Sequence, residues 1–477
     1  MRQSYAAFFV QDDWRASDHI SLQAGLRYDF VTDPKEENGK VAGLLSLDDL
    51  NTKPDGITPG TPMFKNPSKK SFAPRLGAAW NPWGDKKSTI KAGYGLFYQP
   101  LTTSFYRGTT FRIYPYFTGV DIRTPPVFGP GMIDVLNAGV NPATVQKRSE
   151  FINYEEKQPF MEQWHANIDR DLGHRMVAEI GYLGSKGHNL PFYGDPNTTP
   201  SQYVNGVKML VPGATLRYPS WGRIRTRINE ARSIYHGLTA SWNKRYASNW
   251  QAQASYTYGN AHDTWSGGQI GGSDFDNGAG SASDWFDPEY EYGPSSYDIR
   301  HTMVLNGVYV LPWGQDKTGF VGVLAKGWQV GGVAQFSSGI PFTPFESYDQ
   351  VGDGQSDTGL QKPNVNGPIV YTGTAAQWFD PSVFSVPAAG VYGNAHRNSM
   401  RAPGLKVADL SLFKNQKVGR VMTQFRLEAF NAMNWVNLGL PDATIFNSGG
   451  VRNPTAGRIT RTSTPARQIQ LGLKVSF

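Results

Sequence analysis

The last stretch of the chain, Arg467–Phe477, reads RQIQLGLKVSF, and its pattern decides the fold. Successive side chains of an extended strand point to opposite faces. Alternation places these residues on one face: Ile469, Leu471, Leu473, Val475 and Phe477. The residues between them are polar or glycine, so the pattern predicts a strand with one apolar face. Such a strand is long enough to cross a bilayer at a tilt, although edge and core strands of soluble β-proteins can show the same pattern.

The same alternation recurs along the chain and predicts about 13 strands in all. Apart from the terminal stretch, the expected strands are Ser4–Trp14, His19–Val31, Phe72–Asn81, Thr89–Gln99, Phe160–Leu172, Met176–Ser185, Ser233–Arg245, Trp250–Asn260, Arg300–Leu311, Gly327–Ser338, Leu405–Asn415 and Arg420–Met433. No window holds about 18 consecutive apolar residues, which excludes a transmembrane helix but leaves a membrane barrel open.

The connections between these strands alternate between short turns and loops of roughly 30 to 60 residues, whereas compact soluble domains mostly use about 4 to 6. Outer-membrane barrels have short periplasmic turns and long extracellular loops. The connection Pro312–Lys326 is longer than the other turns and partly apolar. We therefore predict an all-β fold, a transmembrane antiparallel β-barrel located in the bacterial outer membrane.

The composition agrees with a membrane barrel, because aromatic residues make up 13% of the chain and Gly numbers 53. Aromatic residues near strand ends fit the interfacial girdles of such barrels. Charged residues on the faces opposite the apolar ones would line the lumen, namely Arg27, Asp29, Arg75, Lys91, Glu179, Arg426 and Glu428.

Several function classes find no support in the composition. The chain has no cysteine, which removes disulfides, thiolate metal sites and cysteine nucleophiles. The net charge is +7, but the 46 Lys and Arg residues are scattered without a basic run, so we expect no nucleic-acid partner. The eight histidines form no H-E-x-x-H spacing, and no G-x-S-x-G elbow occurs. We predict no enzyme activity, no metal site and no cofactor.

Two loop segments could bind an ion, and for both a simpler interpretation is favoured. Residues 349–357 (DQVGDGQSD) could offer oxygen ligands to Ca²⁺, but their spacing departs from the EF-hand pattern. Gly267–Gly280 is glycine-rich without a following Lys-Ser/Thr, so a surface loop is favoured over a phosphate loop.

Particular blocks of the sequence resemble Oar-like TonB-dependent receptors, large outer-membrane transporters. The blocks are GWQVGG at 327–332, SGIPFTP at 338–344, WFDP at 378–381, YGNA at 392–395, DLSLFKN at 409–415, FRLEAFN at 425–431 and GRIT at 457–460. The aromatic carboxy-terminal strand, including Phe477, also resembles the signal that the outer-membrane assembly machinery recognises.

The resemblance implies a barrel of about 22 strands whose lumen holds a plug. It also implies an amino-terminal regulatory-like module and a box that contacts TonB, none of which is present in residues 1–477. We therefore expect the carboxy-terminal part of a receptor barrel, with outer-membrane lipid and the assembly machinery as partners and the TonB complex reached only through the plug region. The implied function is uptake of a large substrate such as an oligosaccharide, a peptide or a chelate.

Parity of the strands points the same way as the resemblance. If the short turns are periplasmic, the first and last strands run in the same direction, which leaves an odd number of strands to be supplied before Met1. The amino terminus also lacks an export signal.

Candidate substrate-binding residues are loop aromatics that could stack on sugars or peptide side chains: Trp265, Trp285, Phe286, Tyr290, Tyr292 and Trp378. The alternative is that they pack the loops against one another, which we favour. Two other functions stay open from sequence, a passive porin-like barrel and a soluble β-sandwich or propeller that binds glycans.

Overall fold

In the part of the chain that the structure describes, thirteen strands follow one another in a single antiparallel sheet. The computed structural model describes residues 2–52, 58–85, 87–101, 116, 147–266, 283–354 and 361–477. In chain order the strands are β1 (Tyr5–Arg15), β2 (Ile20–Val31), β5 (Phe72–Trp80), β6 (Ser88–Tyr98), β8 (Phe160–Gly173), β9 (Met176–Gly194), β12 (Trp221–Ala247), β13 (Trp250–Asp263), β15 (His301–Val310), β16 (Trp328–Ser337), β22 (Leu405–Val418), β23 (Val421–Phe430) and β26 (Gln468–Ser476). Each predicted strand is present and pairs with its sequence neighbours, so the predicted fold is confirmed.

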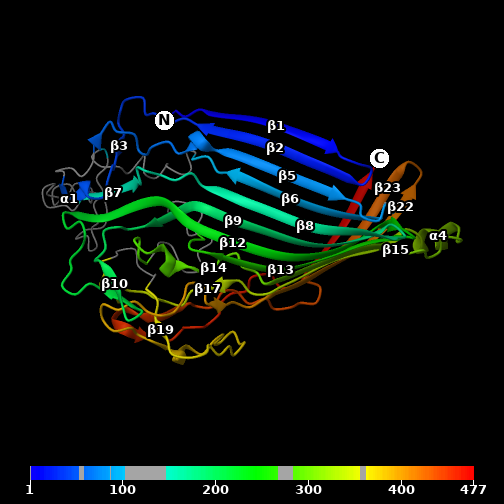
Figure 1. Cartoon of the computed structure of the whole chain (residues 1–477). Coiled ribbons are helices and arrows are strands. Elements are labelled where there is room, and N and C mark those ends of the chain that lie inside the picture. The colour runs from blue at the N-terminus through cyan, green and yellow to red at the C-terminus, as the bar shows by residue number, and fades with distance from the viewer. Residues whose placement is uncertain are drawn as a thin grey trace.

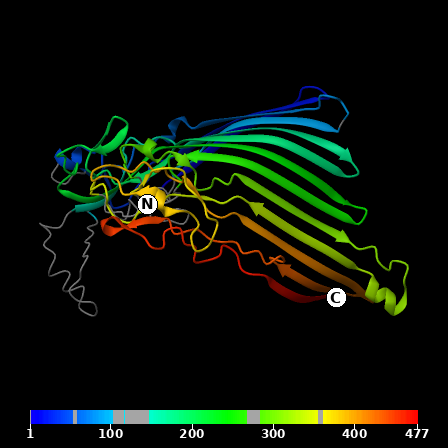
Figure 2. The ribbon, with the colours of Figure 1, turned by 90° about the horizontal axis from the view of Figure 1, so that it is seen from below.

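The sheet is curved, with the short turns at one end and the long loops at the other (Figure 1). Seen from below, its strands lie side by side from β1 to β26 (Figure 2). Within the described residues β1 pairs only with β2, and β26 only with β23. None of the helices in the described part of the chain is long and apolar enough to span a membrane.

Turn chemistry sets the register of the hairpins. Ala247 pairs with Trp250 across Ser248 and Asn249, whose φ values are 55° and 70°. Two consecutive positive φ angles define the type I′ turn, whose twist matches that of the flanking strands. The turn between Val418 and Val421 has a positive φ only at its first central residue, Gly419 at 61°, as in a type II′ turn.

Cross-strand register confirms that apolar side chains share one face. Tyr309, Val330, Leu412, Leu427 and Leu471 are paired in a continuous row across β15, β16, β22, β23 and β26. The adjacent row on the other face holds Gln470, Glu428 and Ser411. We call the first face outward and the second inward, because a membrane barrel presents apolar side chains to lipid.

Glycines on the strands make room for large neighbours. A Cβ on Gly184 would lie 2.3 Å from the Trp164 ring, and one on Gly93 would lie 2.6 Å from the His165 ring. The aromatic rings thus cover the glycine backbone of the next strand, on the outward and inward faces respectively. Such pairs stabilise strand neighbours that lack a side chain of their own.

The strands β9 and β12 extend beyond the predicted limits, and the loops contain short elements that alternation could not indicate. The extended start of β12 pairs in parallel with β7 (Lys147–Ile152), and β13 pairs with β14 (Gly293–Pro294). The other elements are β3 (Ala42–Gly43), α1 (Asp49–Thr52), β4 (Thr58–Pro59), η1 (Ser68–Lys70), β10 (Ser201–Val204), β11 (Val207–Leu210), η2 (Pro288–Glu291), α4 (Gly319–Ala325), β17 (Pro341–Phe342), β18 (Phe345–Glu346), β19 (Asn364–Val365), η3 (Pro381–Val383), β20 (Phe384–Ser385), β21 (Met400–Arg401), β24 (Thr444–Asn447), η4 (Ser448–Gly450) and β25 (Val451–Arg452).

The hydrophobic core lies at the loop end and not in the middle of the sheet. One cluster of buried residues centres on Trp221 and Phe151, and a larger one on Phe342, Phe379 and Phe384. By contrast, the outward side chains of the strands are exposed, with Leu471 at 67%. The loops therefore fold as a packed layer of their own.

Candidate functional site

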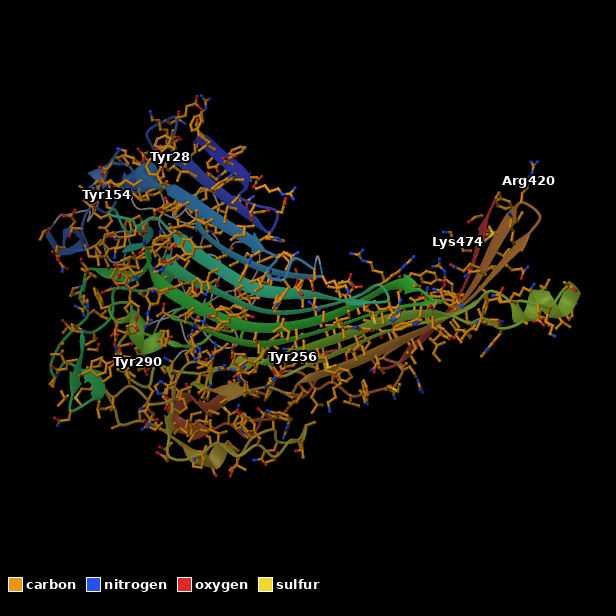
Figure 3. All side chains as sticks on the ribbon, turned by 45° about the vertical axis from the view of Figure 1, so that its right-hand side comes forward. Tyr28, Tyr154, Tyr256, Tyr290, Arg420 and Lys474 are labelled. Atoms are coloured by element: carbon orange, nitrogen blue, oxygen red, sulfur yellow. The ribbon has the colours of Figure 1, made fainter. Side chains whose placement is uncertain are left out.

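The loops form a folded structure that we call the loop cap, consisting of the described residues 32–52, 58–71, 147–159, 195–232, 283–299, 339–354, 361–403 and 434–465. Four of the six predicted binding aromatics lie in its segment 283–299. Figure 3 places Tyr290 at this end of the molecule, far from Arg420 and Lys474 at the turn end. The loop cap is therefore where the molecule could meet a substrate from outside.

Tyr290 lies at the centre of a buried polar cluster. Its ring contacts two ammonium groups, with Lys362 Nζ 3.9 Å and Lys208 Nζ 4.9 Å from the ring centroid. Its hydroxyl donates to the Gly393 carbonyl at 2.8 Å. Burial is the main cause that raises the pKa of Tyr290 well above its ordinary value, and the nearby Glu291 carboxylate raises it further. The phenol is therefore a neutral packing and hydrogen-bonding group.

Lys208, on the hairpin β10–β11, connects that hairpin to segment 283–299. Its ammonium lies 2.9 Å from an Asp284 oxygen and 2.6 Å from an Asp287 oxygen. Tyr203 donates a hydrogen bond to the same Asp287 carboxylate at 2.8 Å. Burial alone would raise the pKa of Asp287, but the bonds from Lys208 and Tyr203 hold it below its ordinary value. The carboxylate therefore stays ionised.

Lys362 and Glu291 form a second buried pair, at 3.0 Å with both side chains almost fully buried. Burial opposes the charged form of Glu291, yet Lys362 and hydrogen bonds from Ser283 hold its pKa below the ordinary value. Removing one partner of such a pair leaves an uncompensated buried charge. The pair therefore joins segment 283–299 firmly to segment 361–403.

Arg397 joins three segments of the chain. Its side chain is 1% exposed and pairs with the Asp263 carboxylate at the end of β13. It also donates to the Glu291 carbonyl at 2.7 Å and to the Ser266 hydroxyl at 3.0 Å. Asp263 lies 134 residues away in sequence, so no local pattern could have revealed this contact. The cap is thus held together by charges that sequence reasoning missed.

Three of the predicted aromatics, Trp265, Trp285 and Phe286, cluster beside the first half of β12. Trp285 is buried in an apolar cluster with Phe192 and Ala231, against which Trp265 also packs. Phe286 meets Trp285 edge to face at 5.0 Å, and the Arg217 guanidinium lies 3.8 Å from the Phe286 ring centroid. Of the three, Phe286 is the most open to solvent, at 39% exposed.

The remaining two predicted aromatics, Tyr292 and Trp378, also make contacts within the cap. The Arg232 guanidinium lies 4.3 Å from the Tyr292 ring centroid. Trp378 donates its indole N–H to the Arg401 carbonyl at 2.8 Å and packs against the Phe342 cluster. The structure thus brings the six residues into packing contacts, and their role in binding substrate stays a prediction.

The inward face of the sheet carries paired charges, as the alternation predicts. Lys91 lies 2.5 Å from Asp169, and Arg27 lies 3.0 Å from Asp29. These pairs would face the lumen of a barrel and make it polar. Contact of these charges with a plug stays a prediction.

The two candidate ion-binding loops fall partly or wholly outside the described residues. Gly267–Gly280 lies outside them, as do residues 355–357 of the proposed Ca²⁺ loop. In the described part of that loop, Asp349 accepts hydrogen bonds from the backbone of Gly352 and Gly354, at 2.7 and 3.1 Å. Among the described residues no cluster of three or more His, Asp or Glu is arranged to hold a metal ion.

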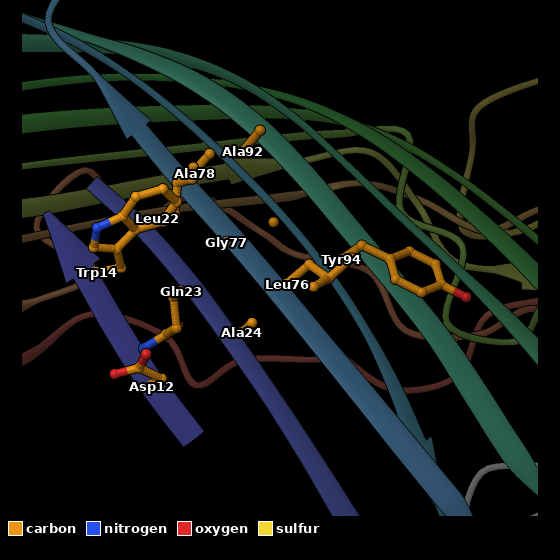
Figure 4. A pocket seen from close by; sticks show the side chains of 11 residues that line it. Asp12, Trp14, Leu22, Gln23, Ala24, Leu76, Gly77, Ala78, Ala92 and Tyr94 are labelled. Carbon is orange, nitrogen blue, oxygen red and sulfur yellow. The ribbon is translucent and has the colours of Figure 1, made fainter. Parts of the chain in front are cut away.

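A hollow of about 560 Å³ lies at the turn end of β1, β2, β5 and β6 (Figure 4). Its lining is mostly apolar and comes mainly from the outward rows of the sheet, including Trp14, Leu22, Leu76, Ala78 and Tyr94. Since this face of a barrel meets lipid, the hollow is a place for hydrocarbon and not for a polar substrate.

Comparison with known proteins gives the family. The chain matches the model of the family described as "Outer membrane beta barrel domain" over residues 1–470. No curated protein matches the sequence.

Solved structures that are similar to it include the outer membrane transporter YddB from Escherichia coli, with 12% identity and a TM-score of 0.47, over 99% of this chain and 45% of that one. The siderophore receptor PirA from Acinetobacter baumannii has 12% identity and a TM-score of 0.48, over 100% of this chain and 46% of the receptor. The chain thus spans less than half the length of these proteins. Because the family match covers nearly the whole sequence, this chain belongs to the outer membrane β-barrel domain family.

Proposed function

We propose that the chain is the carboxy-terminal part of a TonB-dependent receptor barrel of Oar-like type, which imports a large substrate such as an oligosaccharide, a peptide or a chelate. The observation that carries this proposal is the loop cap. Its segments are joined by nearly fully buried ion pairs such as Lys362–Glu291 and Arg397–Asp263. A preorganised cap over the loop end suits selective capture of a large substrate better than free passage of small solutes.

The sequence blocks around 327–344 and 378–460 add the receptor type to the proposal, since the fold alone is shared by outer-membrane barrels of many functions. In the proposed receptor the inward charges contact a plug, and coupling to the TonB complex runs through that plug. The outer-membrane assembly machinery is proposed to recognise β26 through its apolar residues and Phe477. The soluble glycan-binding alternative is wrong, because the chain belongs to the outer membrane β-barrel domain family.

Phe286 is the proposed first contact for substrate on the cap. Its ring is partly exposed and contacts both the Trp285 ring and the Arg217 guanidinium. An aromatic ring fixed in this way loses little conformational entropy when it stacks on a ligand. The other five aromatics would support it by keeping the loops in place.

Energy dependence of uptake tests the proposal. Cells carrying the intact gene and a deletion strain are supplied with labelled oligosaccharides, peptides and ferric chelates, with and without a protonophore. We expect gene-dependent uptake of at least one substrate, and we expect the protonophore to abolish it. Uptake that persists in de-energised cells would favour the passive porin-like alternative and overturn the receptor proposal.

A further inference from the structure

The hairpin loop between β15 and β16 differs from the other turns at its end of the sheet. It contains the helix α4 (Gly319–Ala325), which projects past the neighbouring strand ends in Figures 1 and 3. Apolar side chains of this loop are exposed, with Phe320 at 77%, Trp313 at 62%, Val321 at 60% and Leu324 at 55%. Exposed apolar side chains gathered in one loop are typical of a surface that contacts a membrane or another protein.

The helix α4 exposes one apolar side. Phe320, Val321 and Leu324 have the spacing i, i+1, i+4, which places them on one side of a helix. The opposite side carries Gly322, where a Cβ would lie 2.5 Å from the Lys317 carbonyl oxygen. The buried side therefore packs on the loop's own backbone, and the apolar side is left free.

Two outward-facing strand residues hold the helix. Trp328 donates its indole N–H to the Leu324 carbonyl at 2.8 Å. Lys414 donates to the Val323 carbonyl at 2.5 Å and also to the Lys326 carbonyl. A cation bonded to the last carbonyls of a helix complements the negative end of its dipole. The contacts therefore tie α4 to the lipid side of the sheet and not to the lumen side.

Register places these two residues in the outward apolar band. Trp328 pairs with Lys414, Lys414 with Phe425, and Phe425 with Leu473. Phe425 and Leu473 are exposed on the face that meets lipid. The apolar face of α4 is thus continuous with the membrane-facing surface at its periplasmic edge, where Trp and Lys are favoured.

From this continuity we propose that residues 312–326 form an interfacial anchor, in which α4 lays Phe320, Val321 and Leu324 into the phospholipid leaflet on the periplasmic side. Interfacial helices bury an apolar face at the boundary between headgroups and acyl chains, with basic residues at the headgroups. Lys317 and Lys326 flank the helix and are positioned by sequence for that role. The anchor would fix the tilt of the β15–β16 hairpin in the bilayer, independently of what the protein transports.

The absence of cysteine from the chain allows a direct test with single-cysteine variants. Phe320→Cys and Val321→Cys carry an environment-sensitive fluorophore in the full chain, reconstituted into vesicles of phosphatidylethanolamine and phosphatidylglycerol. Leu471→Cys is the lipid-facing reference. Only vesicle preparations in which nitroxide lipids quench the label at 471 are used, because quenching there shows that the protein is inserted. Asp316→Cys in the same loop and Arg420→Cys in the next turn are the aqueous controls, since both native residues are exposed.

We expect labels at 320 and 321 to be quenched by shallow nitroxide lipids and to be several-fold less accessible to iodide than labels at 316 and 420. Adding Trp328→Phe, which removes the bond to Leu324, should partly restore iodide access at 321. Iodide quenching at 320 and 321 equal to that at 420 would overturn the proposal. Cross-linking between two Phe320→Cys chains would also overturn it, in favour of a second copy as the covering partner.

Discussion

The strands and the loop cap use apolar residues in opposite ways. On the strands, large apolar side chains such as Leu471 and Ile180 are more than half exposed. In the cap, Phe342, Phe379 and Trp221 are almost fully buried. Each region is stable in its own surroundings, because lipid covers the first set and protein covers the second.

Charges follow the same division. Ion pairs on the inward face of the sheet, such as Lys91–Asp169, keep contact with solvent, with the lysine side chain 49% exposed. The cap also has exposed pairs such as Lys65–Glu155, but it contains pairs such as Lys362–Glu291 that are nearly fully buried. Exposed pairs contribute little to stability, whereas breaking a buried pair is costly. The comparison teaches that in this molecule the specific interactions are concentrated in the loops.

The largest effect is expected from breaking the buried charge network of the cap. Arg397→Met leaves the Asp263 carboxylate buried and unpaired, and should lower the free energy of opening of the cap by about 3–5 kcal/mol. Amide hydrogen exchange of residues 283–299 measures this opening. Arg2→Met is the matched control, because Arg2 and Glu37 are exposed partners worth about 0–1 kcal/mol. Exchange that is equally slow in both variants would contradict the proposed role of Arg397.

The next effect tests which face of β26 meets lipid. Leu471→Arg should destabilise the folded protein by about 2–4 kcal/mol if the residue lies near the bilayer midplane, because a guanidinium would enter hydrocarbon. Gln470→Arg, on the inward face, should cost much less. Refolding titrations in bilayers measure both, and equal costs would show that the two faces are not distinguished by the membrane.

A pH-dependent effect is expected at Glu346 on β18. Burial raises its pKa to about 7, and neither carboxylate oxygen has a hydrogen-bond partner among the described residues. Because folding raises the pKa of Glu346, the protonated carboxyl contributes fully to stability below its ordinary pKa of 4.5. This contribution is lost as the pH rises through 7. The loss should approach roughly 3 kcal/mol at pH 8.

Glu346→Gln removes this titration and should make opening of β18 nearly independent of pH between 5 and 8. The rate of proteolysis of the cap at several pH values measures this opening, after correction for the pH dependence of the protease itself. Asp287 and Glu291 titrate in the other direction, because their pKa values are held below the ordinary range and their contribution is lost in acid. If opening of β18 in the Glu346→Gln variant still depended on pH as it does in the unchanged protein, Glu346 would be excluded as the source of the pH dependence.

The smallest effect concerns a single hydrogen bond of the cap. Trp378→Phe keeps an aromatic ring against the Phe342 cluster but loses the bond to the Arg401 carbonyl, so opening around β21 should become easier by about 0.5–1.5 kcal/mol. Trp83→Phe, in an exposed turn at the other end of the sheet, should have no measurable effect. Local hydrogen exchange compares the two, and an effect at Trp83 as large as that at Trp378 would contradict the distinction between the regions.

Sequence by itself determined the strands, their order and their two faces. The alternation in Arg467–Phe477 and its repeats is a local property, because each side chain's face depends only on its position along the strand. Short turns such as Ser248–Asn249 then forced sequential antiparallel pairing. Strand limits at β9 and β12 were missed, since their extensions pair mainly with each other, with register shifts, and do not alternate clearly.

Only the tertiary structure decided how the loops are used. Arg397 meets Asp263 and Lys362 meets Glu291 across 134 and 71 residues, distances at which no spacing rule operates. It also decided that Trp285 and Tyr290 are packed while Phe286 stays partly open, and that α4 is tied to the outward side by Trp328 and Lys414. The physical reason is that burial and charge pairing depend on which segments meet in space, whereas alternation depends on the backbone alone.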